Sequence, residues 1–186
     1  MKEKIKQSAI KLFYKKGYFA TGMRTLANAV GIQKSSIYHH YPSKEDILMD
    51  IFRTTMIDLQ DMLRTCLDEP STTMEKVQRV IKEHIIFHIE RKEEVIIADS
   101  ELRGLTAGNY KEIIQMRDDY EKEIQRLLKE CVVEGIFPEM DINVISYAIL
   151  TMCSAVPLWF KKSGRLSKEE VADIYTEMIL KGLAKS

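Results

Sequence analysis

Residues 21–44, TGMRTLANAVGIQKSSIYHHYPSK, decide how the N-terminal part of the chain folds. Two short runs with helical spacing of apolar residues flank Gly31, and glycine can adopt the positive φ that a tight turn between helices requires. Ala27 supplies the small side chain that is needed where two such helices cross steeply. Apolar anchors for the pair stand at Leu26, Val30, Ile32 and Ile37. The stretch therefore predicts two helices joined by a tight turn, with the second helix presented outward in a shape that fits the major groove of DNA.

The second helix of this pair carries side chains that are small, basic or able to hydrogen-bond, the kinds that contact base edges and phosphates. These candidate DNA-binding residues are Gln33, Lys34, Ser35, Ser36, Tyr38 and His39. The Gln33 amide can pair with an adenine edge through two hydrogen bonds, or it can be a weak helix cap that points to solvent. His40, at the end of the helix, is expected to pack beside Tyr41. The alternative for the whole stretch is a generic helical hairpin with a glycine turn.

The formal net charge of zero hides a strong segregation of charge along the 186 residues. Up to Lys44 the chain has nine basic residues and one acid, Glu3, and so carries a charge of +8, while the remainder carries −8. A basic segment on an acidic body favours a polyanionic partner for the basic segment alone. A solvated basic face is the alternative.

Composition favours an all-α fold, because the chain has only four prolines and eight glycines and is rich in Lys, Glu, Ile, Leu and Met. Capping residues, most of them followed three positions later by an acid, mark the helix starts. These caps are expected at Thr21, Ser43, Thr72, Asn109, Asp141 and Ser167. After two helices that end before Gly17 and at Val30, the expected helices cover about 34–41, 44–68, 73–91, 93–103, 110–135, 142–162 and 168–184.

Three cysteines without a CxxC spacing predict neither a disulfide framework nor a zinc site, which is typical of a reducing cytoplasm. The N-terminus is too charged for a secretion signal. Residues 142–160 hold no charged side chain and just reach the length of a membrane-spanning helix. Polar residues interrupt this segment, so a helix buried on several sides in a cytoplasmic protein is expected, with a membrane anchor as the alternative.

No pattern of catalytic or metal-ligating residues stands out. His84 and His88 are one helical turn apart, but the zinc-protease pattern needs a glutamate directly after the first histidine, where this chain has Ile85. Two partly exposed helix histidines are the ordinary interpretation. The sequence also has no glycine-rich phosphate loop and no GxSxG turn. We therefore expect no enzyme, and no catalytic residue, metal or cofactor.

The run from Ala9 to Glu45 resembles the N-terminal domain of the TetR family of transcriptional regulators through the pattern AxxLFxxxGYxxTxxRxLAxAxGIxKxSIYxHYxSKE. The resemblance implies a three-helix helix-turn-helix DNA-binding domain over 1–50 and a C-terminal helical bundle over 51–186 for effector binding and dimerisation. Carried over by position, it implies phosphate contacts by Thr21 and Thr25, a contact by Arg24, a recognition helix that starts at Lys34, Ser35 and Ser36, and phosphate or sugar contacts by Tyr38, His39 and Lys44. The chain departs from the family pattern at Gln33, where a small cap is usual, and at His39, where an aromatic residue is common.

A single recognition helix spans only a few base pairs, which favours a homodimer that reads two half-sites of a palindromic operator. The last two helices are the expected interface, because apolar side chains surround most of their circumference. These side chains are Ile142, Val144, Ile145, Ala148, Ile149, Met152, Val156, Leu158, Trp159 and Phe160, followed by Val171, Ile174, Tyr175, Met178, Ile179 and Leu183. The alternative is that both helices form the core of a monomer.

Residues 73–91 and 110–135 carry an apolar stripe that is either ordinary helix core or the wall of an effector pocket. A second set of residues is similar to TetR-type regulators of fatty-acid and acyl-CoA metabolism: Glu101-Leu102-Arg103, then Ile113-Ile114-x-x-Arg117-Asp118-x-Tyr120-Glu121, then Trp159. In those regulators an acyl chain lies among the helices and basic groups meet the coenzyme A phosphates. The resemblance implies effector contacts by Arg103, Arg117, Tyr120 and Trp159, although Arg117 can instead pair with Asp118 or Glu121.

These features together lead us to expect a sequence-specific transcriptional regulator. It would be a repressor that a small apolar effector, such as a long-chain acyl-CoA or fatty acid, releases from double-stranded operator DNA. Release is expected through the helix that begins at Ser43, because an effector that moves this helix changes the spacing between two recognition helices. The alternative is a helical ligand-binding protein without operator binding.

Overall fold

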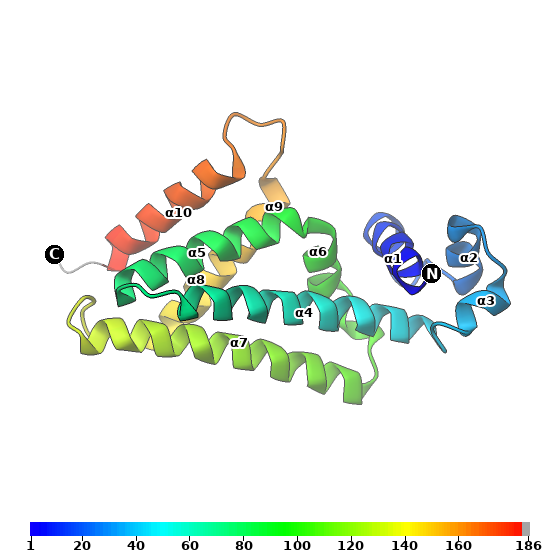
Figure 1. The fold of residues 1–186 in the computed structure, drawn as a ribbon, viewed down its shortest axis with the longest axis horizontal. Coiled ribbons are helices and arrows are strands. Elements are labelled where there is room, and N and C mark those ends of the chain that lie inside the picture. The colour runs from blue at the N-terminus through cyan, green and yellow to red at the C-terminus, as the bar shows by residue number, and fades with distance from the viewer. Residues whose placement is uncertain (184–186) are drawn as a thin grey trace. The chain divides into compact units, whose positions relative to one another are not determined.

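The computed structural model describes residues 1–183, and this part of the chain contains helices and no strand, which confirms the predicted all-α fold (Figure 1). The helices are α1 (Lys2–Lys16), α2 (Met23–Val30), α3 (Lys34–Tyr38), α4 (Lys44–Asp68), α5 (Thr73–Glu90), α6 (Lys92–Ser100), the 3₁₀ helix η1 (Leu102–Gly104), α7 (Ala107–Val133), α8 (Ile142–Ser154), α9 (Val156–Trp159) and α10 (Lys168–Leu183). They form two compact units: Met1–Ile57 with Lys92–Met116, and Asp58–Arg91 with the chain from Arg117 onward. The functional division after residue 50 remains a prediction.

The first unit is built around the apolar faces of α1 to α3, the first turns of α4, and α6. Helix α1 packs against both α2 and α6, so residues 92–116 complete a core that the N-terminal helices begin. The fully buried side chains of this core include Ile5, Phe13, Leu26, Ile37, Tyr41, Ile47, Phe52 and Ile97. Removing these large apolar side chains from water is the main force that holds the short helices α2 and α3 in place.

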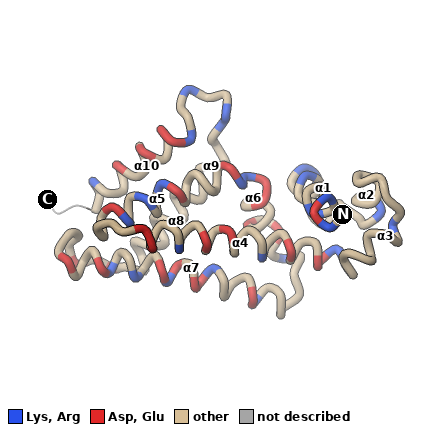
Figure 2. Tube along the Cα trace, in the orientation of Figure 1, with Lys and Arg blue, Asp and Glu red and all other residues tan. Residues whose placement is uncertain are grey.

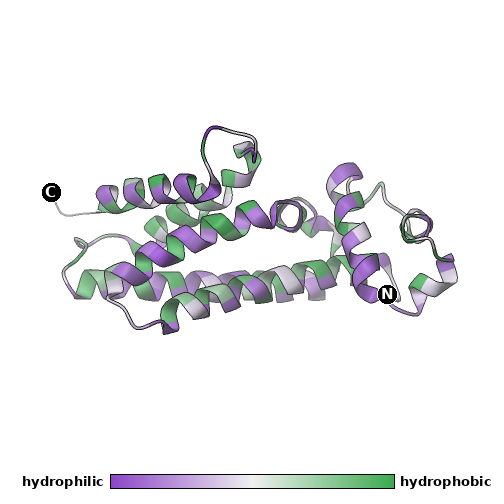
Figure 3. Ribbon diagram, turned by 45° about the horizontal axis from the view of Figure 1, so that its top comes forward, coloured by the Kyte–Doolittle hydropathy of each residue, from purple (hydrophilic) through white to green (hydrophobic). Residues whose placement is uncertain are grey.

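The second unit is organised around α5, which packs against α8, α9 and α10. Hydrophobic and hydrophilic residues alternate in bands along the long helices (Figure 3), as expected for amphipathic helices that bury one face. The buried face of α5 consists of Val77, Val80, Ile81, His84, Ile85, His88 and Ile89. Two histidines in this otherwise apolar set are the unusual feature of the core.

Most of the predicted helix starts are confirmed. Thr72 and Glu75 form a reciprocal capping box, and Asp141 accepts hydrogen bonds from the first backbone N–H groups of α8. Ser43 and Ser167 each exchange hydrogen bonds with the acid three residues later. The helix cap predicted at Asn109 is wrong, because α7 already begins at Ala107. The Asn109 side-chain amide instead donates to Glu45 Oε1 at 2.7 Å.

The single helix predicted over 142–162 is wrong. The chain breaks at Ala155 into α8 and the short α9, in which Pro157 occupies the first turn. Proline has no N–H to donate and its ring collides with the carbonyl group four residues earlier, so a continuous helix cannot pass through it. Ile142–Trp159 is apolar and long enough to span a membrane, yet only 28% of it is buried within one chain, so the single chain does not supply the expected burial on several sides. An apolar and largely exposed segment therefore remains to be explained.

Candidate DNA-binding site and effector cavity

The turn between α2 and α3 has the geometry that the sequence predicts. Gly31 adopts the left-handed conformation, with φ 76° and ψ 32°, and the N–H of Ile32 donates to the Ala27 carbonyl oxygen at 3.0 Å. Leu26, Ala27 and Ile37 are all buried. The two helices are thus fixed against the core by their inner side chains, which leaves the outer face of α3 in solvent.

The outer face of α3 carries the predicted contact residues. Gln33, Lys34, Ser35, Tyr38 and His39 are exposed, and Ser36 is half-buried. Gln33 occupies the N-cap position, but its side chain makes no capping hydrogen bond, so its amide is not committed to holding the helix. The exposed side chains include donors, acceptors and one cation, a set that can read base edges and grip phosphates.

The end of α3 differs from the prediction in one respect. The helix stops at Tyr38, and His40 is exposed instead of packed. Tyr41 takes the buried place, and its hydroxyl donates to Asp50 Oδ2 at 2.5 Å. The tyrosine fills the core because its ring brings far more apolar surface than an imidazole does.

The predictions for α2 are partly wrong. Thr21 is fully buried and its hydroxyl donates to the Gly17 carbonyl oxygen at 2.9 Å, so its side chain cannot reach a phosphate in this structure. It is also not the helix cap, because Gly22 holds the N-cap position of α2. Arg24 is exposed and Thr25 is half-buried, and both remain candidate contacts.

Lys44, another predicted phosphate contact, is already engaged within the protein. Its Nζ donates to the Tyr18 carbonyl oxygen at 2.8 Å and lies 4.0 Å from the centroid of the Tyr18 ring. Burial lowers the pKa of Lys44, and the nearby Glu101 carboxylate opposes this effect. Lys44 therefore positions the α1–α2 corner, and a phosphate would have to compete for its ammonium group.

Basic residues outnumber acids on α1 to α3, whereas the remaining helices carry both kinds with acids in excess (Figure 2). Lys2 and Lys6 pair with Asp50 and Glu3 respectively. The following basic residues form no ion pair with an acid in the described part of the chain: Lys11, Lys15, Lys16, Arg24 and Lys34. Their uncompensated charge makes this part of the first unit attractive to a polyanion.

The four predicted effector contacts do not converge on one cavity. The Arg103 guanidinium lies 5.2 Å from the Phe19 ring centroid, and Trp159 stacks on Tyr175 with half of its surface exposed. Arg117 is half-buried in α7. Tyr120 alone is buried, and its hydroxyl lies 2.7 Å from His84 Nδ1. Only Tyr120 is therefore connected to the cavity described next.

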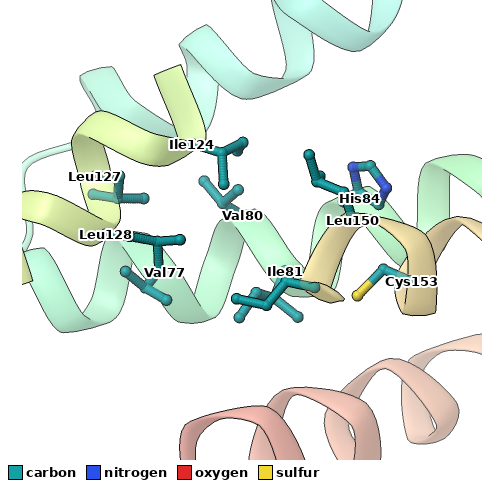
Figure 4. Close-up of a pocket in the computed structure, with 10 residues that line it drawn as sticks. Val77, Val80, Ile81, His84, Ile124, Leu127, Leu128, Leu150 and Cys153 are labelled. Atoms are coloured by element: carbon teal, nitrogen blue, oxygen red, sulfur yellow. The ribbon is translucent and has the colours of Figure 1, made fainter. Parts of the chain in front are cut away.

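A small cavity lies among α5, α7 and α8 (Figure 4). Its lining is apolar apart from one imidazole and one thiol and consists of Val77, Val80, Ile81, His84, Ile124, Leu127, Leu128, Ile149, Leu150 and Cys153. Figure 4 shows His84 at one end, near Leu150 and Cys153, with Leu127, Leu128 and Val77 at the other. The cavity has a volume of about 20 Å³, which is room for about one water molecule. Any larger occupant requires the surrounding helices or side chains to move.

His84 and His88 are buried, which corrects the expectation that they are partly exposed. Only 4% and 7% of their surfaces are accessible, and their rings stack with centroids 4.1 Å apart. His84 Nε2 lies 3.0 Å from Ser154 Oγ, which in turn lies 3.2 Å from His88 Nε2. Desolvation, followed by repulsion from His88, holds the pKa of His84 well below its usual value. Sequence reasoning could not find this cluster, because its members come from three helices.

Comparison with known proteins relates both halves of the chain to one kind of regulator. The family model described as bacterial regulatory proteins, tetR family, matches residues 5–51, and the model described as tetracyclin repressor-like, C-terminal domain, matches residues 70–183. The chain is 26% identical to the HTH-type transcriptional repressor KstR2 of Mycolicibacterium smegmatis over 187 residues, which cover 100% of this chain and 91% of the repressor.

Solved structures give the same relation. The TetR family regulator PfmR from Thermus thermophilus superimposes with a TM-score of 0.89 at 32% identity, over 97% of this chain and 99% of PfmR. AibR in complex with isovaleryl coenzyme A and operator DNA superimposes with a TM-score of 0.87 at 25% identity, over 95% of this chain and 96% of AibR. The similarity extends over nearly the full length in each comparison.

Proposed function

The chain belongs to the TetR family of bacterial regulatory proteins and is a helix-turn-helix transcriptional regulator, and from this premise we propose that it is a homodimeric repressor released from its operator by an apolar effector. The observation that carries the proposal is the outer face of α3, where Gln33, Lys34, Ser35 and Tyr38 are exposed while Ile37 anchors the helix in the core. A rigid, outward helix of this kind fits the major groove. We propose no catalytic step for this protein, and we propose that it acts in the cytoplasm.

The exposed apolar residues of the last helices support dimerisation. At least 49% of the surface of each of these large side chains is exposed: Val144, Tyr147, Leu158, Trp159, Ile174 and Met178. Several large apolar side chains exposed on the same helices are typical of an interaction site. The apolar segment Ile142–Trp159 reaches the length of a membrane span only by combining α8 with the short α9 across the break at Ala155, and polar side chains within a span are costly. A second copy of the chain is therefore the better partner for this surface than a membrane.

An acyl-CoA or fatty acid is the effector class that we propose. AibR, which was solved with isovaleryl coenzyme A, supports an acyl thioester, and the apolar lining of the cavity suits an acyl chain. Ligand pockets usually offer a few hundred Å³ or more, so the small cavity has to widen as the effector enters. That widening is the conformational change through which an effector can favour one state of the protein over another.

Helix α4 is the proposed route of release. It begins at Lys44, a few residues after α3, and runs to Asp68, so that its two ends belong to the two units. A coupling free energy of about 1–3 kcal/mol along this helix would weaken operator binding about 5- to 150-fold.

Selection of genomic fragments bound by the purified full-length protein tests the proposal. We expect a small set of palindromic sites, bound tightly at low salt and released by an acyl-CoA pool. Folded protein that binds no duplex at low ionic strength would contradict operator binding and favour a helical ligand-binding protein. The genes next to the selected sites would narrow the effector class.

A further inference from the structure

We propose that His84, the member of the His84–Ser154–His88–Tyr120 cluster that lines the cavity, is the polar end of the effector site and recognises an uncharged ligand oxygen, a carbonyl or hydroxyl, at one end of an apolar body. This inference rests on the proposed function, since it concerns how the effector is selected. The carbonyl oxygen of an acyl thioester is such a group, whereas the carboxylate of a free fatty acid is not.

With both imidazoles neutral, the direction of each hydrogen bond in the cluster follows from the last acceptor. His88 Nδ1 lies 2.8 Å from the His84 carbonyl oxygen, which can only accept, so the proton of a neutral His88 is on Nδ1. His88 Nε2 must then accept from the Ser154 hydroxyl at 3.2 Å. The Ser154 proton is thereby used, so His84 Nε2 donates to Ser154 Oγ at 3.0 Å. His84 Nδ1 finally accepts from the Tyr120 hydroxyl at 2.7 Å.

Burial and stacking disfavour a positive charge on either imidazole of this cluster. Both imidazoles are more than nine-tenths buried and lie face to face, so a proton on one would bring a cation against the other in a medium of low polarity. The residues that line the adjoining cavity include no lysine, arginine or carboxylate. A ligand anion would find no counter-charge there.

The cluster can exchange one partner for a ligand oxygen without losing a hydrogen bond. Ser154 Oγ accepts from His84 but sends its own proton to His88. If a ligand carbonyl takes the His84 Nε2–H instead, Ser154 keeps its bond to His88, and no buried donor is left unsatisfied. A ligand hydroxyl can accept the same proton and donate to Ser154 Oγ. The polar end of the site thus accommodates a neutral oxygen at little cost.

The geometry of the lining sets the shape of the ligand. His84 lies at one end of the cavity and Val77 at the other (Figure 4), and seven residues of α5 separate them by about 10 Å. Tyr120 also borders a second crevice of about 370 Å³ between α4 and α7, whose other lining residues include the apolar Leu63 and Leu67 and the charged Arg64, Asp68, Asp119 and Glu123. The Tyr120 side chain therefore lies between this crevice and His84, and its hydrogen bond to His84 holds it there.

Infrared difference spectroscopy with carbonyl-¹³C methyl decanoate tests the proposal on the full-length protein. We expect the ester carbonyl band to move to lower wavenumber on binding, as it does when the oxygen accepts a hydrogen bond. His84→Leu should abolish this band shift and weaken ester binding about tenfold, whereas His84→Gln should retain most of the shift. Ile149→Val is the matched control, because it alters the same cavity without changing a polar group, and should leave the band shift intact.

The outcomes separate this inference from the proposed function. An unshifted carbonyl band in the wild-type protein, decanoate bound at pH 8 as tightly as its methyl ester, or no binding of either probe would overturn the polar site. The wild-type spectrum decides the question even if His84→Leu does not fold. Operator binding measured without any probe tests the regulator itself, and its loss would contradict the proposed function whatever the spectra show.

Discussion

Glu101 accepts a hydrogen bond from the backbone N–H of Tyr18 at 3.1 Å, across 83 positions of the chain. Lys44 donates to the carbonyl oxygen of the same tyrosine at 2.8 Å, so both polar groups of the Tyr18 backbone are held by side chains from other elements. The second oxygen of the Glu101 carboxylate, Oε2, is buried without a hydrogen-bond partner. The α1–α2 corner thus depends on the end of α6 and on the start of α4.

Replacing Glu101 tests this dependence. Glu101→Ala should lower the free energy of unfolding by about 1–3 kcal/mol, because it leaves the buried Tyr18 N–H unsatisfied. Glu101→Gln keeps a side-chain oxygen as acceptor and should cost less. Urea denaturation of both variants measures the difference. Equal stabilities for the two variants would show that the hydrogen bond to Tyr18 contributes nothing.

Close packing at Gly104 predicts a second effect at the same corner. A Cβ added to Gly104 would lie 2.7 Å from Tyr18 Cε1 and 3.0 Å from Leu48 Cδ2, so Gly104→Ala should lower the free energy of unfolding by about 1–3 kcal/mol. Gly108 is the matched control, because a Cβ there meets no atom within 4 Å. In helix α7, Gly108→Ala should be neutral or stabilising by up to about 1 kcal/mol. Thermal melting of the pair gives the comparison.

Salt dependence should reveal how the first unit binds DNA. With about six phosphates neutralised per dimer, the logarithm of affinity should fall against the logarithm of salt concentration with a slope near −5. Lys34→Ala, changed in both protomers, should reduce the slope by about 2. Lys129→Ala on α7, far along the sequence from α3, is the control and should leave the slope unchanged. Fluorescence anisotropy on a selected operator measures each slope, and a flat titration would contradict electrostatic binding.

Gln33 should read a base instead of a phosphate. Gln33→Ala is expected to relax preference for one base pair in each half-site by about 1–3 kcal/mol, because the amide can pair with an adenine edge through two hydrogen bonds. The salt slope should stay as in the wild type. Competition between operators that differ at single positions provides the measurement. If all single-base operators weaken equally, Gln33 is only an exposed cap.

Local chemistry explains which features could be read from the sequence. The Gly31 turn and the cap at Thr72 depend on residues within a few positions of each other, and both are confirmed. Thr21 could not be placed correctly, because its burial results from packing within the first unit. The histidine cluster depends on Tyr120 and Ser154, which follow His84 by 36 and 70 positions. Pattern analysis sees spacing along one helix, whereas these contacts join three.

The apolar surface of α8 to α10 leads to the last prediction. Ile174 and Tyr147 are half or more exposed and contribute no side chain to the buried core, so a charge at either position should not unfold a monomer. Ile174→Lys and Tyr147→Glu should instead raise the dimer dissociation constant by at least tenfold, because a buried unpaired charge is costly at an interface. Sedimentation velocity measures the oligomeric state, and Lys129→Glu, an exposed charge change on α7, is the control. Operator affinity should fall with dimerisation, because one α3 alone reads too few base pairs for tight binding. A variant that stays dimeric and binds normally would place the interface elsewhere.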